Sequence, residues 1–235
     1  MGVPDGKRRL YGDLDPREMP AYTVPEAARY LKLPVATVRS WALGRYYPTS
    51  SGRRFFRPVI RLADSADRLL SFLNLVEAHV LAGIRRHGVK LDKIRIAIRY
   101  LARHFPSPRP LADHRFETDG LDLFVEKYGQ LINVSRGGQL AIRESLKSYL
   151  RRIERDSAGL PIKLYPFTGY GGPQPPRSVV IDPLVSFGRP VLLGTGIPTS
   201  AVFERYQAGE SVEELAEDYN LTSVDIQEAI RCEAA

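Results

Sequence analysis

The segment YTVPEAARYLKLPVATVRSW, from Tyr22 to Trp41, contains two short runs of apolar residues at helical spacing. Lys32-Leu33-Pro34 separates the runs, and Pro34 fits the start of the second because proline is favoured in the first turn of a helix. The pattern predicts a helix-turn-helix. Its buried faces would consist of Val24, Ala27, Ala28 and Leu31 in the first helix and Val35, Val38, Trp41 and Ala42 in the second.

The second predicted helix leaves Thr37, Arg39 and Ser40 on its outer side. Short polar side chains and an arginine at such positions can reach base edges and phosphates in the major groove of DNA. Two short amphipathic helices also occur in ordinary bundles, so the pattern alone leaves DNA binding and simple packing as equal alternatives. We take these three residues as candidate recognition side chains.

Residues 44–62, GRYYPTSSGRRFFRPVIRL, combine a turn-rich tip with arginines and aromatic residues. A β-hairpin wing beside a helix-turn-helix needs this composition, and a solvated basic loop is the alternative. Guanidinium groups would bind phosphates, which sets the register on DNA without reading its sequence. We expect Phe55 and Phe56 to pin the hairpin to the core. The candidate DNA contacts of this segment are Arg45, Arg53, Arg54 and Arg57.

The composition of the 235 residues narrows the class of protein. A net charge of +7 and a pI near 9.6 permit nucleic-acid binding, and 43% hydrophobic residues suffice for buried cores. The single cysteine, Cys232, excludes disulfide frameworks and cysteine-based metal sites. The basic N-terminus is not followed by an apolar run, and no apolar stretch is long enough to cross a bilayer. We therefore expect a cytoplasmic protein without a membrane partner.

Charge is distributed unevenly along the chain. Residues 1–105 contain 20 lysines and arginines against 9 aspartates and glutamates, whereas residues 199–235 contain 2 against 9. A basic and an acidic segment rarely face the same partner. We expect the first to face nucleic acid and the second to face protein.

A longer helix is predicted from Ser71 to about His87, with His79 on its apolar stripe as a hydrogen-bonded core residue. The order of helix-turn-helix, arginine-rich wing, long helix and HGVKLDKIRIAIRYL resembles the DNA-binding domain of the MerR class. Gly88, Leu91 and Ile94 match the turn into the last helix of that class. The resemblance covers about residues 20–104 and implies a winged helix that binds DNA as a dimer, with the recognition helix at about 35–42. The long dimerisation coiled coil of the class is missing.

A proline-rich segment, FPSPRPL at residues 105–111, predicts a boundary between a first domain (1–105) and a middle module (111–168). The module is expected to be a small α+β unit that links or dimerises. Its predicted elements are short strands at 114–117, 121–126 and 131–134, joined by tight turns at 118–120 and 128–129. A turn at 135–138, a helix at about 140–156 and a strand at 162–167 follow. Basic residues of the helix segment could touch DNA or could be solvated, namely Arg143, Lys147, Arg151, Arg152 and Arg155.

The C-terminal block, residues 177–235, contains Asp182-Pro183, FGRPV at 187–191 and GTGIP at 194–198, followed by three predicted short helices. The helices cover about 200–208, 212–219 and 222–230, and Ser211 with Glu214 predicts a capping box. This block resembles the family called domain of unknown function 433, whose members are commonly antitoxins encoded beside PIN-domain ribonuclease toxins. Together with the MerR-like segment, the chain resembles a VapB-type antitoxin. Gly196 stands where the family often has arginine.

The acidic side chains of the last helices would repel a phosphate backbone, so we expect them to face protein. They suit a basic surface such as the neighbourhood of a PIN active site, while self-association and a solvated cap remain alternatives. The candidate partner-binding residues are Phe203, Tyr206, Glu213, Glu214, Glu217 and Asp218.

We find no catalytic constellation in the sequence. Gly194-Thr195-Gly196 lacks the Lys-Ser/Thr of a phosphate loop, and the four histidines are scattered without ligand spacing. We therefore expect a protein that is not an enzyme and has no cofactor or metal. The expected fold is mostly helical α+β, with a winged helix-turn-helix, a small α+β middle module and a C-terminal three-helix domain.

The expected function is that of an antitoxin. It would bind operator DNA as a dimeric autorepressor and neutralise a PIN-domain ribonuclease toxin through its C-terminal region. The first alternative is a stand-alone transcription regulator with an oligomerisation tail. The second alternative, a nuclease, has no support in the sequence.

Overall fold

The computed structural model describes residues 14–50, 52–86, 91–105, 107–132, 135–169 and 175–234. Its helix-turn-helix consists of α2 (Val24–Tyr30) and α3 (Val35–Leu43). Thr23 begins α2 with a capping box, because its side chain accepts the backbone N–H of Glu26 while the Glu26 carboxylate accepts the N–H of Thr23. The predicted buried faces are confirmed except at Val35, which is 40% exposed. Val35 lies in the first turn of α3 between two exposed residues, so the helix packs only from Val38 onward.

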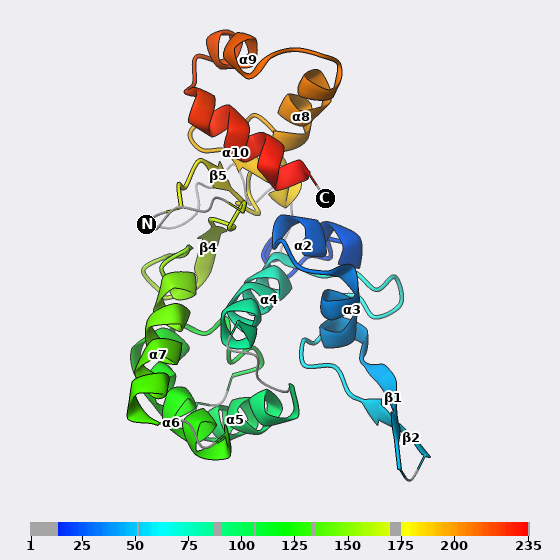
Figure 1. Cartoon of the computed structure of the whole chain (residues 1–235), viewed down its shortest axis with the longest axis vertical. Coiled ribbons are helices and arrows are strands. Elements are labelled where there is room, and N and C mark those ends of the chain that lie inside the picture. The colour runs from blue at the N-terminus through cyan, green and yellow to red at the C-terminus, as the bar shows by residue number, and fades with distance from the viewer. Residues whose placement is uncertain are drawn as a thin grey trace.

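The predicted wing is confirmed as an antiparallel hairpin of β1 (Arg45–Thr49) and β2 (Gly52–Phe56). Figure 1 shows it projecting from the end of α3 at the lower right of the molecule. Gly44 joins α3 to β1 with φ at +76°, and a Cβ there would collide with the backbone oxygen of Phe56. The strands extend closer to the tip than the sequence pattern indicated, since Pro48 and Thr49 pair with Arg53 and Gly52.

The central element is α4 (Phe72–Arg85), which is buried from Phe72 through Ile84 and matches the predicted long helix. A helix that is buried all round lies in a core. It packs against α7 (Arg136–Leu150), while α5 (Leu91–His104) packs against α6 (Leu121–Ile132). Gly88, in the predicted turn into the next helix, lies outside the described residues.

The predicted strands between residues 114 and 134 are wrong, because this stretch is helical where it is described. A π-helical turn, η1 (Phe116–Gly120), leads directly into α6. Two glycines had suggested turns, but both permit close helix packing instead. A Cβ on Gly120 would meet Leu101 at 2.9 Å, and one on Gly129 would meet Gln139 at 2.7 Å. The spacing of buried residues is also helical, as the positions of Leu121, Phe124, Val125 and Tyr128 show.

The predicted turn at 135–138 is likewise wrong. Ser135 caps α7, because its hydroxyl accepts the backbone N–H of Gly138. This helix ends at Leu150 instead of near Asp156, and the chain continues as the hairpin of β3 (Ile153–Arg155) and β4 (Pro161–Leu164). The middle module is therefore α+β, with two helices and a hairpin in its described part.

One continuous cluster of buried side chains spans both sides of the proline-rich segment. Phe72 of α4, Phe124 of α6 and Leu146 of α7 all belong to it. The middle module thus packs onto the helix-turn-helix unit through a shared core. The division into domains at residues 1–105, 111–168 and 177–235 remains a prediction.

The C-terminal block begins with β5 (Val179–Val180) and β6 (Val191–Leu192), with the 3₁₀ turn η2 (Ser186–Gly188) between them. The three predicted helices follow as α8 (Thr199–Gln207), α9 (Val212–Tyr219) and α10 (Ser223–Glu233). Ser211 with Glu214 forms the predicted capping box. The block has a small core of its own around Leu215 and Ile226.

The observed fold confirms a mostly helical α+β chain with an N-terminal winged helix-turn-helix. The wing and α9 lie at opposite ends of the long axis (Figure 1). None of the helices in the described ranges is long and apolar enough to cross a membrane.

Candidate nucleic-acid interface

A hollow of about 500 Å³ separates α3 from the wing. Thr37 and Ser40 line it from α3, and Arg45 lines it from the wing. Arg39 is exposed and is not part of its wall. The structure therefore brings three of the predicted residues together around one depression and leaves Arg39 outside it. The remaining lining residues are Ala36, Trp41, Tyr47, Phe56, Arg85, Leu91 and Asp92.

The four candidate arginines of the wing segment are all exposed, namely Arg45, Arg53, Arg54 and Arg57. In the described ranges, no carboxylate forms an ion pair with any of them. Arg45 and Arg54 share a face of the hairpin with Tyr47 and Phe56, whereas Arg53 lies on the opposite face. Both faces of the wing thus carry positive charge available to an anion.

Phe56 and Arg95 attach the wing to the rest of the molecule. The guanidinium of Arg95, in α5, stacks 4.2 Å from the centre of the half-buried Phe56 ring and donates a hydrogen bond to the carbonyl of Arg57. Burial, together with the charges of Arg99 and Arg57, lowers the pKa of Arg95 below its ordinary value. A helical period cannot reveal a contact with a distant hairpin, so the sequence pattern did not indicate this role of Arg95.

The expectation that Phe55 pins the wing to the core is wrong. Its side chain is 46% exposed, and its ring lies against that of Tyr46 directly across the hairpin, with the ring centres 5.0 Å apart. Alternation along a strand sends neighbouring side chains to opposite faces, so Phe55 and Phe56 cannot both point inward.

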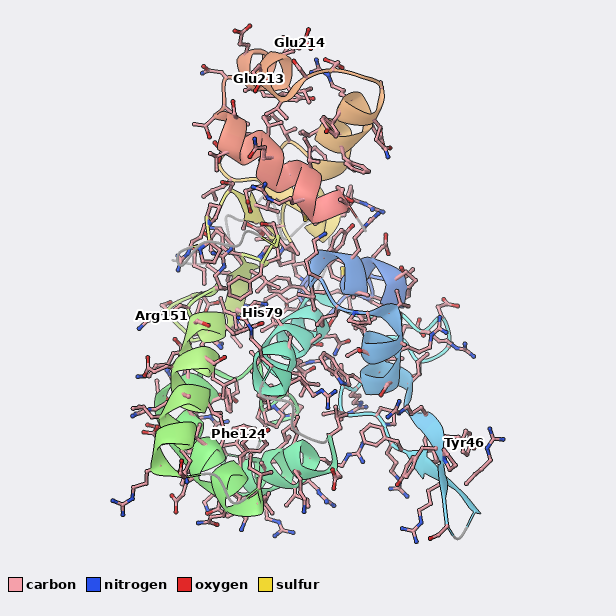
Figure 2. The ribbon with its side chains drawn as sticks, viewed as in Figure 1. Tyr46, His79, Phe124, Arg151, Glu213 and Glu214 are labelled. Carbon is pink, nitrogen blue, oxygen red and sulfur yellow. The ribbon has the colours of Figure 1, made fainter. Side chains whose placement is uncertain are left out.

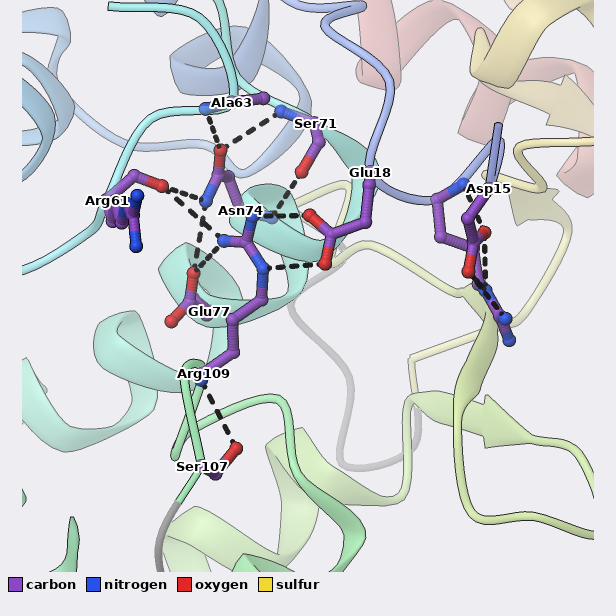
Figure 3. A network of polar contacts seen from close by, with 10 residues as sticks. Asp15, Glu18, Arg61, Ala63, Ser71, Asn74, Glu77, Ser107 and Arg109 are labelled. Carbon is purple, nitrogen blue, oxygen red and sulfur yellow. Dashed lines mark hydrogen bonds and ion pairs between the residues drawn. The ribbon is translucent and has the colours of Figure 1, made fainter. Parts of the chain in front are cut away.

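Asn74 anchors the chain where it leaves the wing. Its side-chain oxygen accepts the backbone N–H of Ala63, and its nitrogen donates to the carbonyl of Arg61 at 2.8 Å (Figure 3). The same residue completes a capping box with Ser71 at the start of α4. The loop that follows the wing is therefore tied to the buried helix α4.

Arg109, from the proline-rich segment, extends this network. It binds Glu77 at 3.0 Å and also pairs with Glu18 (Figure 3). Burial raises the pKa of Glu77 to about 7, although the charge of Arg109 opposes that rise. The segment that the sequence marked as a linker is thus bonded to both α4 and the N-terminal region.

Most of the basic side chains singled out in the middle module are buried or paired. Arg152 is buried and donates to the carbonyls of Tyr165 and Pro166, with two further bonds to the carbonyls of Pro175 and Pro176. Arg155 donates to the carbonyls of Ala112 and Gly159. Arg143 and Lys147 pair with Asp122 and Glu144. Of these five basic residues, only Arg151 is exposed as a whole residue, and Arg152 and Arg155 are taken up by backbone carbonyls; a DNA contact of this helix stays a prediction.

His79 is the predicted core histidine. It is buried, and its Nε2 lies 3.0 Å from the carbonyl oxygen of Tyr149 (Figure 2 labels the residue within the core). Burial lowers the pKa of His79 to about 4, so the ring is neutral near pH 7 and donates this hydrogen bond. It serves packing.

The candidate partner surface lies on α8 and α9, far from the wing (Figure 2). Tyr206 is 43% exposed and Phe203 is half-buried, and the four acidic candidates are all exposed. Glu214 is held by the capping box, and Asp218 pairs with Arg205. Glu213 and Glu217 therefore carry most of the outward charge of this surface.

The C-terminal block is fastened to α2. The Lys32 amine donates to the carbonyls of Cys232 and Ala234 at 3.0 and 2.6 Å, and Arg29 pairs with Glu233. The Tyr22 hydroxyl donates to the carbonyl of Gly188 at 2.8 Å. These contacts were missed because they join residues distant in sequence.

Cys232 lies within this contact and is fully buried. Burial raises the pKa of its thiol to about 12, so the group stays protonated and unreactive. Within the described ranges, no group of three or more His, Cys, Asp or Glu side chains could hold a metal ion.

Comparison with known proteins identifies the family. Residues 20–98 match a model described as "Putative DNA-binding HTH domain", and residues 179–231 match one described as "Protein of unknown function (DUF433)". A Mycobacterium tuberculosis protein named "Putative antitoxin VapB45" is 31% identical over 237 residues, covering 93% of this chain and 95% of that relative.

Two further comparisons with M. tuberculosis proteins cover most of the chain. The uncharacterized protein Rv2308 is 26% identical over 224 residues, with 89% of this chain and 88% of that relative covered. The crystal structure of Rv2018 has a TM-score of 0.64 at 26% identity and covers 91% of this chain and 98% of that one. The chain belongs to the antitoxin family that includes VapB45, and it joins a helix-turn-helix DNA-binding domain to a C-terminal DUF433 region.

Proposed function

We propose that this antitoxin binds its own operator DNA as a dimeric repressor through the winged helix, and neutralises a PIN-domain ribonuclease toxin through α8 and α9. The observation that carries the proposal is the separation of two exposed surfaces of opposite charge. The arginines of the wing lie at one end of the molecule, and the carboxylates of α9 lie at the other (Figure 2). Such a chain can hold two different partners at once.

The hollow between α3 and the wing suits the backbone of a DNA duplex. Thr37 and Ser40 lie on one wall and Arg45 on the other, so a phosphate ridge between them would meet donors from both sides. Arg39 would then reach along the major groove that α3 enters. Arg53, Arg54 and Arg57 would neutralise neighbouring phosphates.

The α8–α9 surface suits a ribonuclease. An enzyme that binds RNA presents a basic surface to phosphates, and the exposed Glu213 and Glu217 are complementary to such a surface. Tyr206 and Phe203 on the neighbouring helix supply aromatic groups of the kind that anchor protein interfaces. In this proposal the antitoxin covers the RNA-binding face of the toxin and performs no catalysis itself.

Point variants of the intact chain test the toxin-binding half. Truncation before residue 177 is unsuitable, because Val179, Ile181 and Cys232 belong to the main core. We would co-express the intact chain with the tagged product of the neighbouring reading frame, and measure retention of the chain and ribonuclease activity. Glu213→Arg/Glu217→Arg should release the partner and restore ribonuclease activity. The exposed Glu126→Arg on α6 serves as the charge control for each of the two single variants, Glu213→Arg and Glu217→Arg.

Two results would count against the toxin-binding half. If the double variant still retains and inhibits the ribonuclease, the α9 carboxylates do not belong to the interface. An intact chain that binds operator DNA but retains no neighbouring product would leave a stand-alone regulator, and the toxin would be abandoned.

A further inference from the structure

A hollow of about 170 Å³ lies where the segment before α2 meets the start of the C-terminal block. Three buried aromatic side chains line it, namely Tyr22, Tyr30 and Phe72. Much of the remaining wall is apolar and comes from Pro16, Met19, Pro20, Ala21 and Pro183. None of the residues assigned above to DNA or to the toxin lines this hollow.

Phe187 borders the hollow from the turn η2 and is 73% exposed. Within the described ranges, no other large apolar residue is as exposed. The backbone of the turn is also unusual, because Ser186 and Phe187 both have positive φ, at 48° and 54°. This left-handed conformation has a steric cost for residues with a Cβ, and such strain clusters at functional sites. Packing within the chain therefore does not account for the position of the Phe187 ring.

The helix-turn-helix unit holds the turn in this conformation. The Tyr22 hydroxyl donates to the carbonyl of Gly188 at 2.8 Å, and the N–H of Gly188 donates to the carbonyl of Val185 at 2.9 Å. A Cβ on Gly188, whose φ is +77°, would collide with the Tyr22 hydroxyl oxygen. Phe187 thus lies next to a bonded and closely packed residue, and its ring is presented on a firm support.

The rim of the hollow carries both signs of charge. Nη1 of Arg189 lies 3.5 Å from Oε1 of Glu26, and the Arg189 side chain is 59% exposed. The other carboxylate oxygen of Glu26 accepts from Thr23 in the capping box. An exposed ion pair of this length contributes little to stability within one chain. Both side chains can therefore pair with charges of a second molecule.

We propose that this surface joins two copies of the chain about a two-fold axis, with Phe187 of each copy seated in the hollow of the other. A two-fold interface uses the same patch on both chains, so each feature must meet its complement within that patch. The patch supplies an exposed ring and an apolar hollow, and Arg189 of each copy can pair with Glu26 of the other. Aromatic residues, methionine and arginine are also the residues that are enriched in protein interfaces.

The inference rests on the dimeric repressor proposed above and names the surface that makes the dimer. Because Tyr22 and Tyr30 line the hollow, the contact would join the two helix-turn-helix units directly. A dimer of this kind binds two half-sites at a fixed spacing. Phe187 would then affect operator binding without touching DNA.

Sedimentation velocity of the intact chain over a range of concentrations tests the proposal. Phe187→Glu should raise the Kd of the dimer by about a hundredfold or more, because two rings lose their burial and two charges enter the interface. Phe187→Gly should also lose association while it keeps the circular dichroism of the folded chain, since glycine adopts the left-handed conformation without strain. Leu140→Glu, at a residue of α7 that is 57% exposed, is the matched control and should not change the Kd.

Charge reversal tests the two-fold geometry. Glu26→Arg and Arg189→Glu each bring like charges together in a homodimer, so each variant alone should associate more weakly. An equal mixture of the two variants should form a heterodimer, because both cross-pairs are then attractive. The Thr23 hydroxyl still accepts the backbone N–H of residue 26, so α2 keeps this cap in Glu26→Arg.

Three results would overturn the proposal. If Phe187→Glu dimerises with the Kd of the unsubstituted chain, the surface is wrong and the dimeric repressor still stands. If the unsubstituted chain is monomeric both free and on its operator, the inference fails together with the dimeric part of the proposed function. If Phe187→Glu releases the co-expressed ribonuclease and leaves the dimer intact, the hollow belongs to that partner instead.

Discussion

The two ends of this molecule are built differently. The wing is a two-stranded hairpin that is attached through Phe56 under Arg95 and is followed by a loop that Asn74 holds at Arg61 and Ala63. The C-terminal block has its own core, pairs Ile181 with Leu164 and places Cys232 in the main core. The wing can therefore present its side chains with little effect on stability, whereas the C-terminal block contributes to the fold of the whole chain.

The largest expected effect tests this contrast directly. Ile226 is fully buried in the C-terminal core, so Ile226→Ala should lower the free energy of unfolding by about 2–5 kcal/mol. Tyr46→Ser, at an exposed site of the wing, should change it by no more than about 0.5 kcal/mol. Urea unfolding followed by circular dichroism measures both. Equal effects at the two sites would show that the wing is as integrated as the C-terminal block.

The core that joins the two ends should respond to acid through His79. The pKa of this ring is near 4 in the folded protein and 6.5 in an unperturbed chain. Its contribution to stability is therefore fully present above pH 6.5 and is lost as the pH falls through about 4, by about 3 kcal/mol in total. The difference in unfolding free energy between pH 7 and pH 4.5 should be smaller in His79→Gln. The same difference in both proteins would mean that other groups dominate.

Asn74 should affect both the free energy of unfolding and the position of the wing. Asn74→Ala leaves the carbonyl of Arg61 and the N–H of Ala63 without this partner, which should cost about 1–3 kcal/mol. Because the loop that leads from the wing to α4 is then less restrained, DNA affinity should also fall. Both quantities are measured on the purified variant by urea unfolding and by anisotropy. A loss of stability with unchanged DNA affinity would show that Asn74 does not position the wing.

The smallest expected effect concerns the contact of the C-terminal block with α2. Lys32→Met removes two hydrogen bonds to carbonyls at the end of α10 and should cost about 1 kcal/mol. Thermal unfolding of the variant, with Lys93→Met on α5 as a control, measures this effect. A thermal midpoint equal to that of the unsubstituted chain would show that the two hydrogen bonds of the Lys32 amine add no net stability, because water binds the amine equally well.

Sequence patterns predicted the elements whose periodicity was regular. The helix-turn-helix, α4 and the three C-terminal helices follow from apolar spacing and from caps such as Ser211, which act within a few residues. The middle module was mispredicted where Gly120 and Gly129 suggested turns, although both sit at close helix contacts. Whether a glycine marks a turn or a close contact depends on a distant partner, and the local pattern does not contain that information.

The candidate sites show the same limit. Composition indicated a basic wing and an acidic α9, and both are exposed. It did not indicate that Arg152 and Arg155 donate hydrogen bonds to backbone carbonyls, or that Arg95 contacts the wing. Charge along the sequence predicts which kind of partner a surface suits. Whether an arginine instead bonds to other parts of the same chain depends on tertiary contacts.

The salt dependence of operator binding tests the central claim most directly. Arg53→Ala/Arg54→Ala removes two exposed guanidinium groups that form no ion pair in the described structure. If both contact phosphates, the slope of log K against log salt should decrease in magnitude by about two, with weaker binding to all duplexes. An unchanged slope and affinity would contradict the assignment of the wing as the DNA interface.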